Sequence, residues 1–384
     1  MSRKRVVILG STGSIGTSSL KVAGDIPERM EVVGLAANCS VDTIAAQVEA
    51  TGVKHVGLAD ERCCDELAPK LGGGVELHRG EQGLLELATL PEADMVIIAI
   101  VGTGGLRPAL AAIEAGKDIA VASKEILVMA GEAVMSAARA KGVQVLPIDS
   151  EHNAIFQCME GRSPDDVTRL ILTASGGPFR TLPAAELAGV TVERALKHPT
   201  WEMGQKITID SATLFNKGLE MIEARWLFDV EMDRVDVIVH PQSIVHSMVE
   251  YVDGSVLAQL STTDMCFPIQ YAVTWPDRVA GALPPVNFAE LGRLEFEAPR
   301  VDAFPALRLA REAGERCGTM PAVMNAANEV AVDVFLKGGL GFTRIAEVVE
   351  TVMDRHALVE GPSLEDLLEA DAEARRVAGE LVAG

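Results

Sequence analysis

Short apolar runs rich in Val and Ile alternate with Ala-, Glu- and Leu-rich segments of helical spacing over residues 4–150. Each run is apolar at consecutive rather than alternate positions, which predicts strands whose two faces are both buried. Parallel strands of this kind are joined by helices, so the alternation predicts a doubly wound α/β sheet. The expected strands are residues 5–9, 31–36, 55–58, 95–100, 118–121 and 143–147.

Two further changes of pattern divide the 384-residue chain, which is too long for one ordinary core. Residues 150–275 mix short strands and helices with Gly and Pro, which predicts an α+β domain. Residues 276–300 contain several prolines and little periodicity, as linkers do, and residues 301–384 have helical spacing. We therefore expect an α/β protein with a Rossmann-like domain over residues 1–149, a central α+β domain, a linker and a C-terminal helical domain.

Charge and composition argue against some classes of partner. The formal net charge is -21, and a chain this acidic repels nucleic-acid phosphates at long range. The longest apolar run, residues 95–101, is much shorter than the ~20 residues of a membrane helix. We expect no nucleic-acid or membrane partner and a cytoplasmic location. The cysteines are scattered without a C-x-x-C pair, which predicts reduced thiols rather than disulfides or a cysteine zinc site.

A glycine-rich turn follows the first expected strand. Gly10, Gly13 and Gly16 stand between residues 5–9 and a helical segment. Glycines there allow a tight turn and a close approach to a pyrophosphate, and the N–H groups at the helix start favour the anion. A plain strand-to-helix turn is the alternative, but the placement favours dinucleotide binding.

The end of the second expected strand indicates which dinucleotide is bound. An NAD enzyme usually places an acid there to bind the ribose hydroxyls, whereas the first acid here is Asp42. Asn38, Cys39 and Ser40 would face a 2′-phosphate without repelling it, which favours NADPH over NADH. No arginine stands in this stretch to bind the phosphate.

Two carboxylates follow the last expected strand of the first domain, where ligands bind in sheets of this type. In an extended stretch, residues two apart face the same side. Asp149 and Glu151 would then point together at one hard cation such as Mg²⁺ or Mn²⁺. Two surface carboxylates at a domain edge are the alternative.

A second polar cluster occupies residues 209–220. Asn216 and Glu220 share one face of the expected helix, so Glu220 is a candidate third carboxylate ligand. Lys217 and Asn216 are candidates to bind phosphate or hydroxyl groups. A solvated helix carboxylate is the alternative interpretation of Glu220.

A loop flanked by Gly and Pro contains Trp201 and Met203. Large apolar side chains in such a loop either pack into the core or close over a ligand as a lid. Ser175, beside two glycines, offers a phosphate one hydroxyl and nearby N–H donors. Lys124 follows an expected strand at a helix start, so it either lies beside the cofactor and the metal or is a surface lysine.

Several long segments together resemble the 1-deoxy-D-xylulose 5-phosphate reductoisomerase family. They are GSTGSIG, ASKEILV, LPIDSEHNAIFQ, ASGGPFR, HPTWEMGQKITIDSATLFNKGLEMIEARWLF and HPQSIVHSMVEYVDGSVLAQL, with NAANE further on. The resemblance implies an enzyme that rearranges and reduces 1-deoxy-D-xylulose 5-phosphate to 2-C-methyl-D-erythritol 4-phosphate, in the non-mevalonate route to isoprenoid precursors. It implies NADPH and Mn²⁺ or Mg²⁺, with Co²⁺ as a further candidate.

The resemblance also implies roles for regions and residues. Residues 1–149 would bind NADPH, residues 150–275 would carry a lid loop (175–205) and the metal site, and the enzyme would be a homodimer. The implied metal ligands are Asp149, Glu151 and Glu220, which with Lys124 are also the implied catalytic residues. The implied substrate contacts are Lys124, Ser150, Glu151, Ser175, His198, Ser211, Asn216, Lys217 and Glu220. The implied cofactor contacts are Thr12, Gly13, Ser14, Ile15, Asn38, Ser123, Glu125 and Gly204.

The chain departs from the family pattern at two places. Many members carry Gly-Lys-Asn where this chain has Asn38-Cys39-Ser40, so a lysine that helps to hold the 2′-phosphate is absent. Many members carry Asn-Lys-Glu where this chain has Ser123-Lys124-Glu125, and serine has the shorter reach.

Two other functions share part of the pattern. A semialdehyde dehydrogenase needs a cysteine nucleophile that becomes acylated, and neither Cys158 nor Cys266 has a suitable partner in the sequence. A non-enzymatic NADPH sensor needs neither three carboxylates nor a lid.

Overall fold

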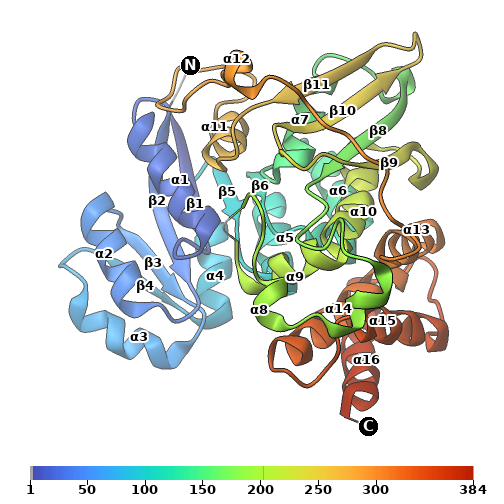
Figure 1. Ribbon diagram of the computed structural model, residues 1–384. Coiled ribbons are helices and arrows are strands. Elements are labelled where there is room, and N and C mark those ends of the chain that lie inside the picture. The colour runs from blue at the N-terminus through green and yellow to red at the C-terminus, as the bar shows by residue number, and fades with distance from the viewer. Residues whose placement is uncertain (1–2, 202, 384) are drawn as a thin grey trace. The chain divides into compact units, whose positions relative to one another are not determined.

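The computed structural model describes residues 3–201 and 203–383, which form two compact units (Figure 1). Unit 1 comprises Met1–Ile126, Glu132–Asn153 and Asp264–Pro284. Unit 2 comprises Leu127–Gly131, Ala154–Thr263 and Pro285–Gly384. Each unit contains its own β-sheet.

A parallel sheet in the order β4-β3-β2-β1-β5-β6-β7 forms the centre of unit 1. Its order reverses between β1 and β5, which is where doubly wound sheets bind ligands. The strands are β1 (Lys4–Leu9), β2 (Met30–Ala37), β3 (His55–Leu58), β4 (Glu76–Arg79), β5 (Met95–Ile98), β6 (Asp118–Val121) and β7 (Val145–Pro147). The helices between and beside them are α1 (Ser14–Asp25), α2 (Val41–Thr51), α3 (Glu61–Leu67), α4 (Gly80–Ala88), α5 (Leu106–Glu114), α6 (Glu125–Lys141) and α11 (Cys266–Thr274).

The doubly wound sheet predicted from the sequence is confirmed. All four residues of β5 are buried, as are the last four of β1, because helices cover both faces of the sheet. The edge strand β4 was not predicted. Its sequence, ELHR, is polar, and only His78 of its four residues is buried, so it carries no hydrophobic pattern.

Gly10 and Gly16 allow the first turn to pack closely against the sheet. A Cβ atom at Gly16 would lie 2.3 Å from the Gly10 carbonyl oxygen and 2.4 Å from the Ser11 Cα. Gly10 has a φ of +97°, and a Cβ atom there would lie 2.3 Å from the Ala99 carbonyl oxygen after β5. Glycine is therefore required at both positions for α1 to start directly above the reversal point of the sheet.

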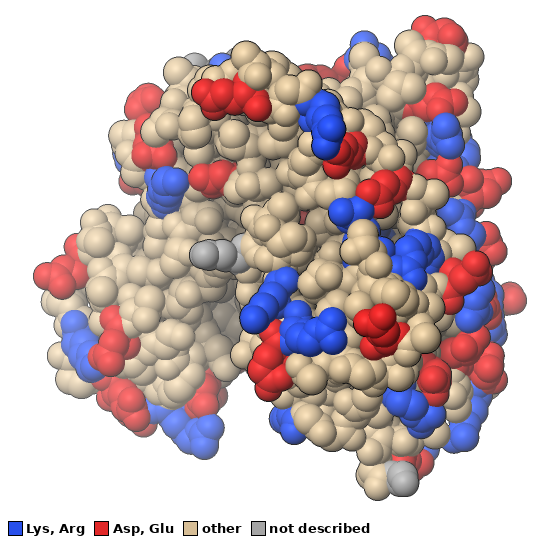
Figure 2. Space-filling view, viewed as in Figure 1, with Lys and Arg blue, Asp and Glu red and all other residues tan. Residues whose placement is uncertain are grey.

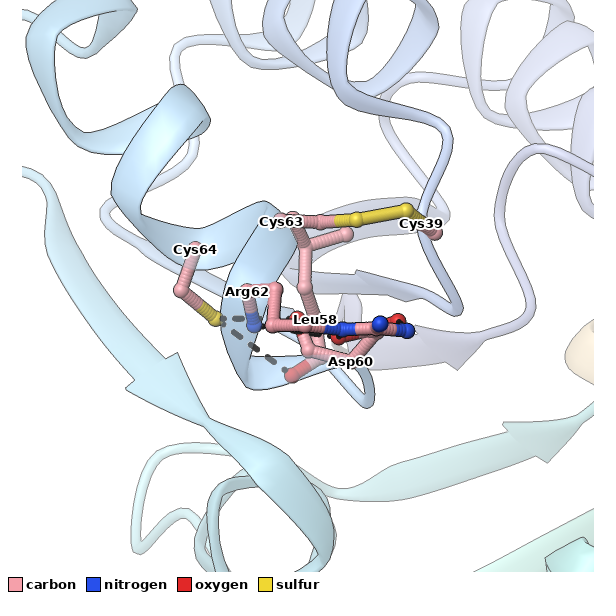
Figure 3. The surroundings of a disulfide bond; sticks show 6 residues. All are labelled: Cys39, Leu58, Asp60, Arg62, Cys63 and Cys64. Carbon is pink, nitrogen blue, oxygen red and sulfur yellow. Dashed lines mark hydrogen bonds and ion pairs between the residues drawn. A yellow bond between two sulfur atoms is a disulfide. The ribbon is translucent and has the colours of Figure 1, made fainter.

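The expectation of reduced thiols is wrong for one pair of cysteines. Cys39 follows β2 and Cys63 lies in α3, and the two form a disulfide with Cα atoms 5.5 Å apart (Figure 3). They meet because β2 and β3 are adjacent parallel strands whose carboxyl ends lie side by side. Sequence spacing alone does not reveal this proximity.

Unit 2 combines a mixed sheet with helices, as the α+β pattern predicts. The strand order is β11-β10-β8-β9, in which β8 and β9 are parallel and the other pairs are antiparallel. The strands are β8 (Val167–Ala174), β9 (Val235–Val239), β10 (Val245–Tyr251) and β11 (Val256–Leu260). The helices in this part of the chain are α7 (Ser150–Met159, which begins in unit 1), α8 (Val192–Ala195), α9 (Gln205–Thr213) and α10 (Phe215–Phe228).

The C-terminal helices share one hydrophobic core with this sheet. Leu172 of β8, Ile222 of α10 and Val323 of α14 belong to the same cluster of buried side chains. Helix α14 packs against α9, α13, α15 and α16 and is buried on most sides. These helices are α12 (Phe288–Leu291), α13 (Ala306–Arg316), α14 (Met320–Leu336), α15 (Arg344–Arg355) and α16 (Leu364–Ala383).

The surface drawn in Figure 2 carries acidic and basic side chains interspersed with one another. Over the whole chain, 55 acidic residues outnumber 34 basic ones, so many basic side chains find an acidic partner. Arg376, for example, pairs with both Glu373 and Glu380 on α16. Within the described residues, no helix is both long enough and apolar enough to span a membrane.

Replacing Gly16 with Ala should lower the free energy of unfolding by about 1–3 kcal/mol, because the added methyl group would meet the backbone of Gly10 and Ser11. Gly24, in the same helix, is the matched control, since nothing lies within 4 Å of the position that its methyl group would take. Gly24→Ala should be neutral or stabilise by up to about 1 kcal/mol, because alanine is the better helix former. Chemical denaturation measures both variants, and equal effects would contradict the close packing at Gly16.

Candidate active site

The glycine-rich turn places an exposed helix start at the reversal point of the unit 1 sheet. Helix α1 begins at Ser14, with Gly13 as its N-cap. Gly13 and Ser14 are exposed, and Thr12 and Ile15 are half-buried. An exposed helix start presents N–H groups that bind anions. These four residues therefore lie where a phosphate would meet backbone donors.

The segment after β2 lies beside the segment after β3. Asn38 is exposed, and its carbonyl oxygen accepts a hydrogen bond from the Asp60 N–H at 3.1 Å. The Asp60 carboxylate in turn accepts two bonds from the Arg62 guanidinium, at 3.1 Å from Nε and 2.7 Å from Nη2 (Figure 3). The stretch after β2 contains no arginine, but the first turn of α3 supplies Arg62, which the sequence pattern did not predict as a site residue.

A buried ion pair lies near the ends of β6 and β7. Lys124 is the N-cap residue of α6, and its Nζ lies 2.5 Å from Asp149 Oδ2. Both flanking residues are also buried, with Glu125 in the first turn of α6 and the Ser123 hydroxyl donating to the Ile100 carbonyl oxygen. The pairing stabilises the Lys124 charge in a site that would otherwise penalise it.

Asp149 and Glu151 converge, but not through the extended stretch that the sequence analysis assumed. Strand β7 ends at Pro147 and α7 begins at Ser150, so Glu151 lies in the first turn of a helix. The two carboxylates still offer oxygen atoms within 4.8 Å of one another, and Ser150 Oγ donates to Glu151 Oε2 at 2.6 Å. Oxygen atoms at this spacing suit a shared hard cation.

In unit 2, His198 connects two serines from separate elements. Its Nε2 lies 2.9 Å from Ser175 Oγ and 3.0 Å from Ser211 Oγ. Its Nδ1 accepts the Trp201 N–H at 2.9 Å, so Nδ1 is the unprotonated nitrogen and Nε2 carries the hydrogen. Burial lowers the pKa of the His198 imidazole to about 4, which keeps the ring neutral near pH 7.

Ser175 lies in a turn that passes closely over α9. The Gly177 N–H donates to Ser175 Oγ at 3.2 Å. Gly177 has a φ of +65°, and a Cβ atom there would lie 2.8 Å from the Ser211 carbonyl oxygen. Because the serine oxygens accept from an N–H or from His198, their hydroxyl hydrogens remain available to donate to a ligand.

Glu220 is fully buried, so its interpretation as a solvated helix carboxylate is wrong. Both of its oxygens have donors on the same helix. Asn216 Nδ2 donates to Oε1 at 2.6 Å, and Lys217 Nζ lies 2.5 Å from Oε2. An isolated carboxylate at such a site would suffer a desolvation penalty of several kcal/mol, and these partners offset it.

The loop before α9 holds the two expected lid residues. Trp201 and Met203 are half-buried, Gly204 is exposed, and Glu202 lies outside the described residues. The Trp201 ring lies 6.3 Å from the His246 ring, centroid to centroid. The two side chains belong neither to the core nor to the open surface, and their function as a lid stays a prediction.

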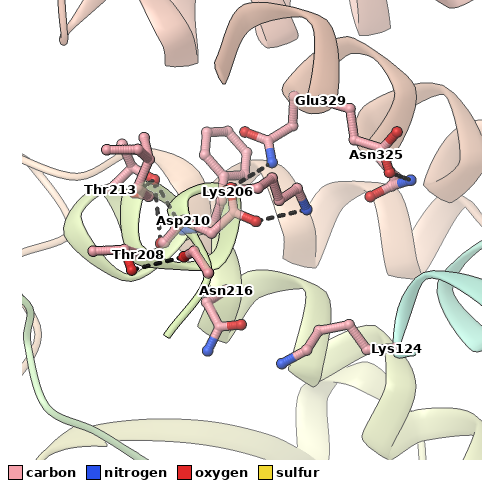
Figure 4. Close-up of polar contacts among 12 residues, drawn as sticks. Lys124, Lys206, Thr208, Asp210, Thr213, Asn216, Asn325 and Glu329 are labelled. Carbon is pink, nitrogen blue, oxygen red and sulfur yellow. Dashed lines mark hydrogen bonds and ion pairs between the residues drawn. The ribbon is translucent and has the colours of Figure 1, made fainter. Parts of the chain in front are cut away.

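Asp210 anchors α9, although its sequence context did not predict it as a site residue. Asn328 Nδ2 of α14 donates to Asp210 Oδ1 at 2.8 Å. Lys206 Nζ lies 2.6 Å from Asp210 Oδ2 (Figure 4). Asp210 therefore joins α9 to α14 and holds the next residue, Ser211, in place beside His198. The NAANE segment contains Asn328, but only the fold shows which side chain it binds.

The predicted site residues thus fall into two groups. In unit 1 they are Thr12, Gly13, Ser14, Ile15, Asn38, Ser123, Lys124, Glu125, Asp149, Ser150 and Glu151. In unit 2 they are Ser175, His198, Gly204, Ser211, Asn216, Lys217 and Glu220. The first group combines an anion-binding helix start with a carboxylate pair, and the second combines hydroxyl and imidazole groups with a buried carboxylate.

Family models match most of the chain. Residues 6–131 match a model described as 1-deoxy-D-xylulose 5-phosphate reductoisomerase. Residues 145–228 match the C-terminal domain described for the same enzyme, and residues 260–377 match a DXP reductoisomerase C-terminal domain.

Individual relatives match over the full length. A 1-deoxy-D-xylulose 5-phosphate reductoisomerase of Pelotomaculum thermopropionicum is 51% identical over 376 residues, which are 97% of each chain. The Geobacter metallireducens protein of the same name is 51% identical over 380 residues, 99% of each chain. The solved structure of the Zymomonas mobilis enzyme in complex with NADPH has a TM-score of 0.93 and 46% identity, covering 99% of each chain. A DOX-P reductoisomerase in complex with NADPH, fosmidomycin and magnesium has a TM-score of 0.95 and 38% identity, covering 99% of this chain and 98% of that one.

His198 should make stability depend on pH between about 4 and 6.5. In the unfolded chain the imidazole takes up a proton near its ordinary pKa of 6.5, whereas burial delays protonation in the folded protein to about pH 4. The unfolded state therefore binds the extra proton in this window, so the contribution is complete above pH 6.5 and is lost as the pH falls towards 4.

His198→Asn should flatten this part of the curve of unfolding free energy against pH, as measured by urea denaturation. The slope is the readout, because the substitution also alters stability at every pH. A slope equal to that of the unmodified protein would contradict the assignment to His198.

Proposed function

The chain belongs to the 1-deoxy-D-xylulose 5-phosphate reductoisomerase family, and we propose that it converts 1-deoxy-D-xylulose 5-phosphate to 2-C-methyl-D-erythritol 4-phosphate. It is an NADPH- and divalent-metal-dependent oxidoreductase of isoprenoid precursor biosynthesis. The observation that carries this function is the 51% identity to a named relative over 97% of the chain, which includes both groups of site residues.

Unit 1 fits NADPH. The turn at Gly10 and Gly16 leaves no room for a Cβ atom and exposes the start of α1, which is what a pyrophosphate needs. Thr12, Gly13, Ser14 and Ile15 would bind the pyrophosphate, and Asn38, Ser123, Glu125 and Gly204 would contact other parts of the cofactor. When bound, NADPH supplies the hydride that reduces the rearranged substrate.

The acidic residues fit a hard divalent cation. Asp149 and Glu151 provide carboxylate oxygens, the ligand type that Mg²⁺ and Mn²⁺ prefer. We assign Glu220 as the third ligand, since family membership implies this role and each oxygen of its buried carboxylate has a hydrogen-bond donor, as in ligating carboxylates. Mg²⁺, Mn²⁺ or, as a further candidate, Co²⁺ would act there as a Lewis acid towards oxygens of the substrate.

The hydroxyl and imidazole group of unit 2 fits the substrate phosphate. Neutral His198 donates its one proton towards the serine oxygens, so Ser175 and Ser211 direct their own hydrogens to phosphate oxygens. Asn216 adds amide hydrogens, and Lys217 adds the positive charge that the neutral histidine lacks.

Lys124 would act on the reacting part of the substrate. In the reaction that the family carries out, a carbon–carbon bond breaks in a retro-aldol step, the fragments recombine to a branched aldehyde, and hydride transfer reduces the aldehyde. Lys124 would stabilise negative charge on the reacting oxygens or carry a proton, while Ser150 and Glu151 contact the substrate. Trp201 and Met203 would exclude water during this sequence.

The proposed domain boundaries, homodimer and location rest on family membership alone. Residues 1–149 would form the NADPH-binding domain, residues 150–275 the catalytic domain with its lid at 175–205, residues 276–300 a linker, and residues 301–384 the C-terminal helical domain. The enzyme would act as a homodimer in the cytoplasm.

Purified protein should oxidise NADPH when both 1-deoxy-D-xylulose 5-phosphate and Mn²⁺ are present, and excess chelator should abolish this oxidation. Glu220→Gln should lower turnover by at least about 100-fold, since a lost catalytic metal ligand removes several kcal/mol of transition-state stabilisation. The same variant should keep its NADPH affinity, measured by fluorescence quenching.

Glu231→Gln is the matched control, because Glu231 is an exposed acid just beyond the same helix. Near-normal turnover of Glu220→Gln at limiting metal would exclude Glu220 as a ligand. Loss of turnover after thiol alkylation, without any metal requirement, would favour a cysteine dehydrogenase instead. NADPH binding without oxidation would favour a sensor.

We also propose that Arg62 binds the 2′-phosphate of NADPH, in place of the lysine that this chain lacks after β2. Arg62 is held by Asp60, whose N–H bonds the Asn38 carbonyl, so its charge is fixed beside the end of β2. Its side chain is 90% exposed and has further N–H donors for a second anion.

Arg62→Gln should weaken NADPH binding by about 10-fold, the loss expected for hydrogen bonds to a charged group, and leave NADH binding unchanged. Arg79→Gln is the matched control, since Arg79 is also an exposed arginine paired with an aspartate in unit 1. Equal losses of affinity for NADPH and NADH would show that Arg62 acts only on the local structure at the start of α3.

A further inference from the structure

The adjacent strands β3 and β4 carry two histidines that the proposed activity does not use. His55 is the first residue of β3, and Glu76 and His78 are in β4. In the parallel register, His55 pairs with Glu76 and Gly57 pairs with His78. Since residues two apart share a face, all three side chains lie on one face of the sheet. The glycine turn, by contrast, is at the carboxyl ends of the strands.

Three electron-pair donors converge at this place. His55 Nδ1 lies 3.3 Å from His78 Nε2 and 3.5 Å from Glu76 Oε2. Each residue offers one ligand atom within 4.8 Å of the other two. Such contacts need either a proton on one of the nitrogens or a metal cation between the atoms.

In the neutral form of each ring, the contact of the outer nitrogen leaves the lone pair on the inner nitrogen. His78 Nδ1 lies 2.9 Å from Glu86 Oε2, and His55 Nε2 lies 2.9 Å from Glu92 Oε1. Carboxylates only accept hydrogen bonds, so each of these outer nitrogens carries a hydrogen. The neutral forms of both rings then point their unprotonated nitrogens at one another and at Glu76. Hydrogen bonds from ligating histidines to carboxylates are the usual second layer of a metal site.

The distances match a zinc ion. Two nitrogens each ~2.0–2.1 Å from Zn²⁺ at a tetrahedral angle lie ~3.3–3.4 Å apart, close to the observed 3.3 Å. A proton between the two nitrogens is the alternative, and it would not require the third donor, Glu76.

Close packing holds His78 in place. Gly57 of β3 and Gly83 of α4 flank its backbone, and a Cβ atom at Gly83 would lie 2.5 Å from the His78 carbonyl carbon. His78 is only 6% exposed, so its ring is rigidly held. Glu76 is 66% exposed at its side chain, which leaves one side of the cluster open to a water as fourth ligand.

We propose that His55 Nδ1, His78 Nε2 and Glu76 bind a zinc ion that cross-links β3 to the edge strand β4. Imidazole nitrogens favour Zn²⁺ over Mg²⁺, so this site differs in chemistry from the oxygen site at Asp149 and Glu151. Strand β4 is polar and lies at the edge of the sheet, so it gains little from burial and would gain most from a metal bridge.

The test compares zinc binding by the full-length protein and its Glu76→Ala variant, stripped of metal and then supplied with excess Mg²⁺. A chromophoric chelator competes for added Zn²⁺ under non-reducing conditions, in which Cys39 and Cys63 stay paired. The unmodified protein should bind one zinc ion per chain more than Glu76→Ala, and that ion should raise its Tm. Glu81→Ala, which removes an exposed acid from α4 outside the cluster, should bind as the unmodified protein does.

Two further variants test whether His78 is a ligand and whether Glu86 supports it. His78→Asn should lose the same zinc ion, and Glu86→Gln should keep it with affinity lower by ~10–100-fold, as for other second-layer carboxylates. Glu76 is largely exposed, so its variant tests the site even if His78→Asn folds poorly. Equal zinc stoichiometry in the unmodified protein and Glu76→Ala, or zinc uptake that appears only after reduction of Cys39 and Cys63, would overturn the proposal.

Discussion

Close backbone packing at the carboxyl edge of the unit 1 sheet is the constraint on which the rest of the structure depends. Gly10 turns the chain back over β5, and Gly16 lets α1 start within contact distance of that turn. All strands of this sheet are parallel, so the segments after them emerge at the same edge. That edge thereby receives the turn at Thr12, the loop at Asn38, Arg62 from the start of α3, and the pair formed by Lys124 and Asp149.

Unit 2 buries charged side chains and stabilises each of them with a partner. Glu220 and Asp210 are both buried, and each is paired with a lysine about one turn away on its own helix. The desolvation penalty is therefore offset locally, before any ligand binds. His198 differs, since it stays neutral and orders two serines through hydrogen bonds alone.

Two regions of one parallel sheet present different donor atoms. The carboxyl edge offers backbone N–H groups and carboxylate oxygens, which suit a dinucleotide and a hard cation. One face of β3 and β4 offers imidazole nitrogens supported by outer carboxylates, which suit zinc.

The sequence by itself determined the doubly wound sheet, the glycine turn and the carboxylates, because these depend on local periodicity and on residue types near strand ends. It did not predict β4, whose polar ELHR segment has no hydrophobic pattern, and it assigned Asp149 and Glu151 to an extended stretch although α7 begins at Ser150. Only the tertiary structure decided that Cys39 bonds Cys63, that Asn328 binds Asp210, that Arg62 stands beside Asn38, and that His55 faces His78. Each of these pairs joins different strands, loops or helices, and the distance between such residues is set by how the elements pack, which the local pattern of a single sequence does not contain.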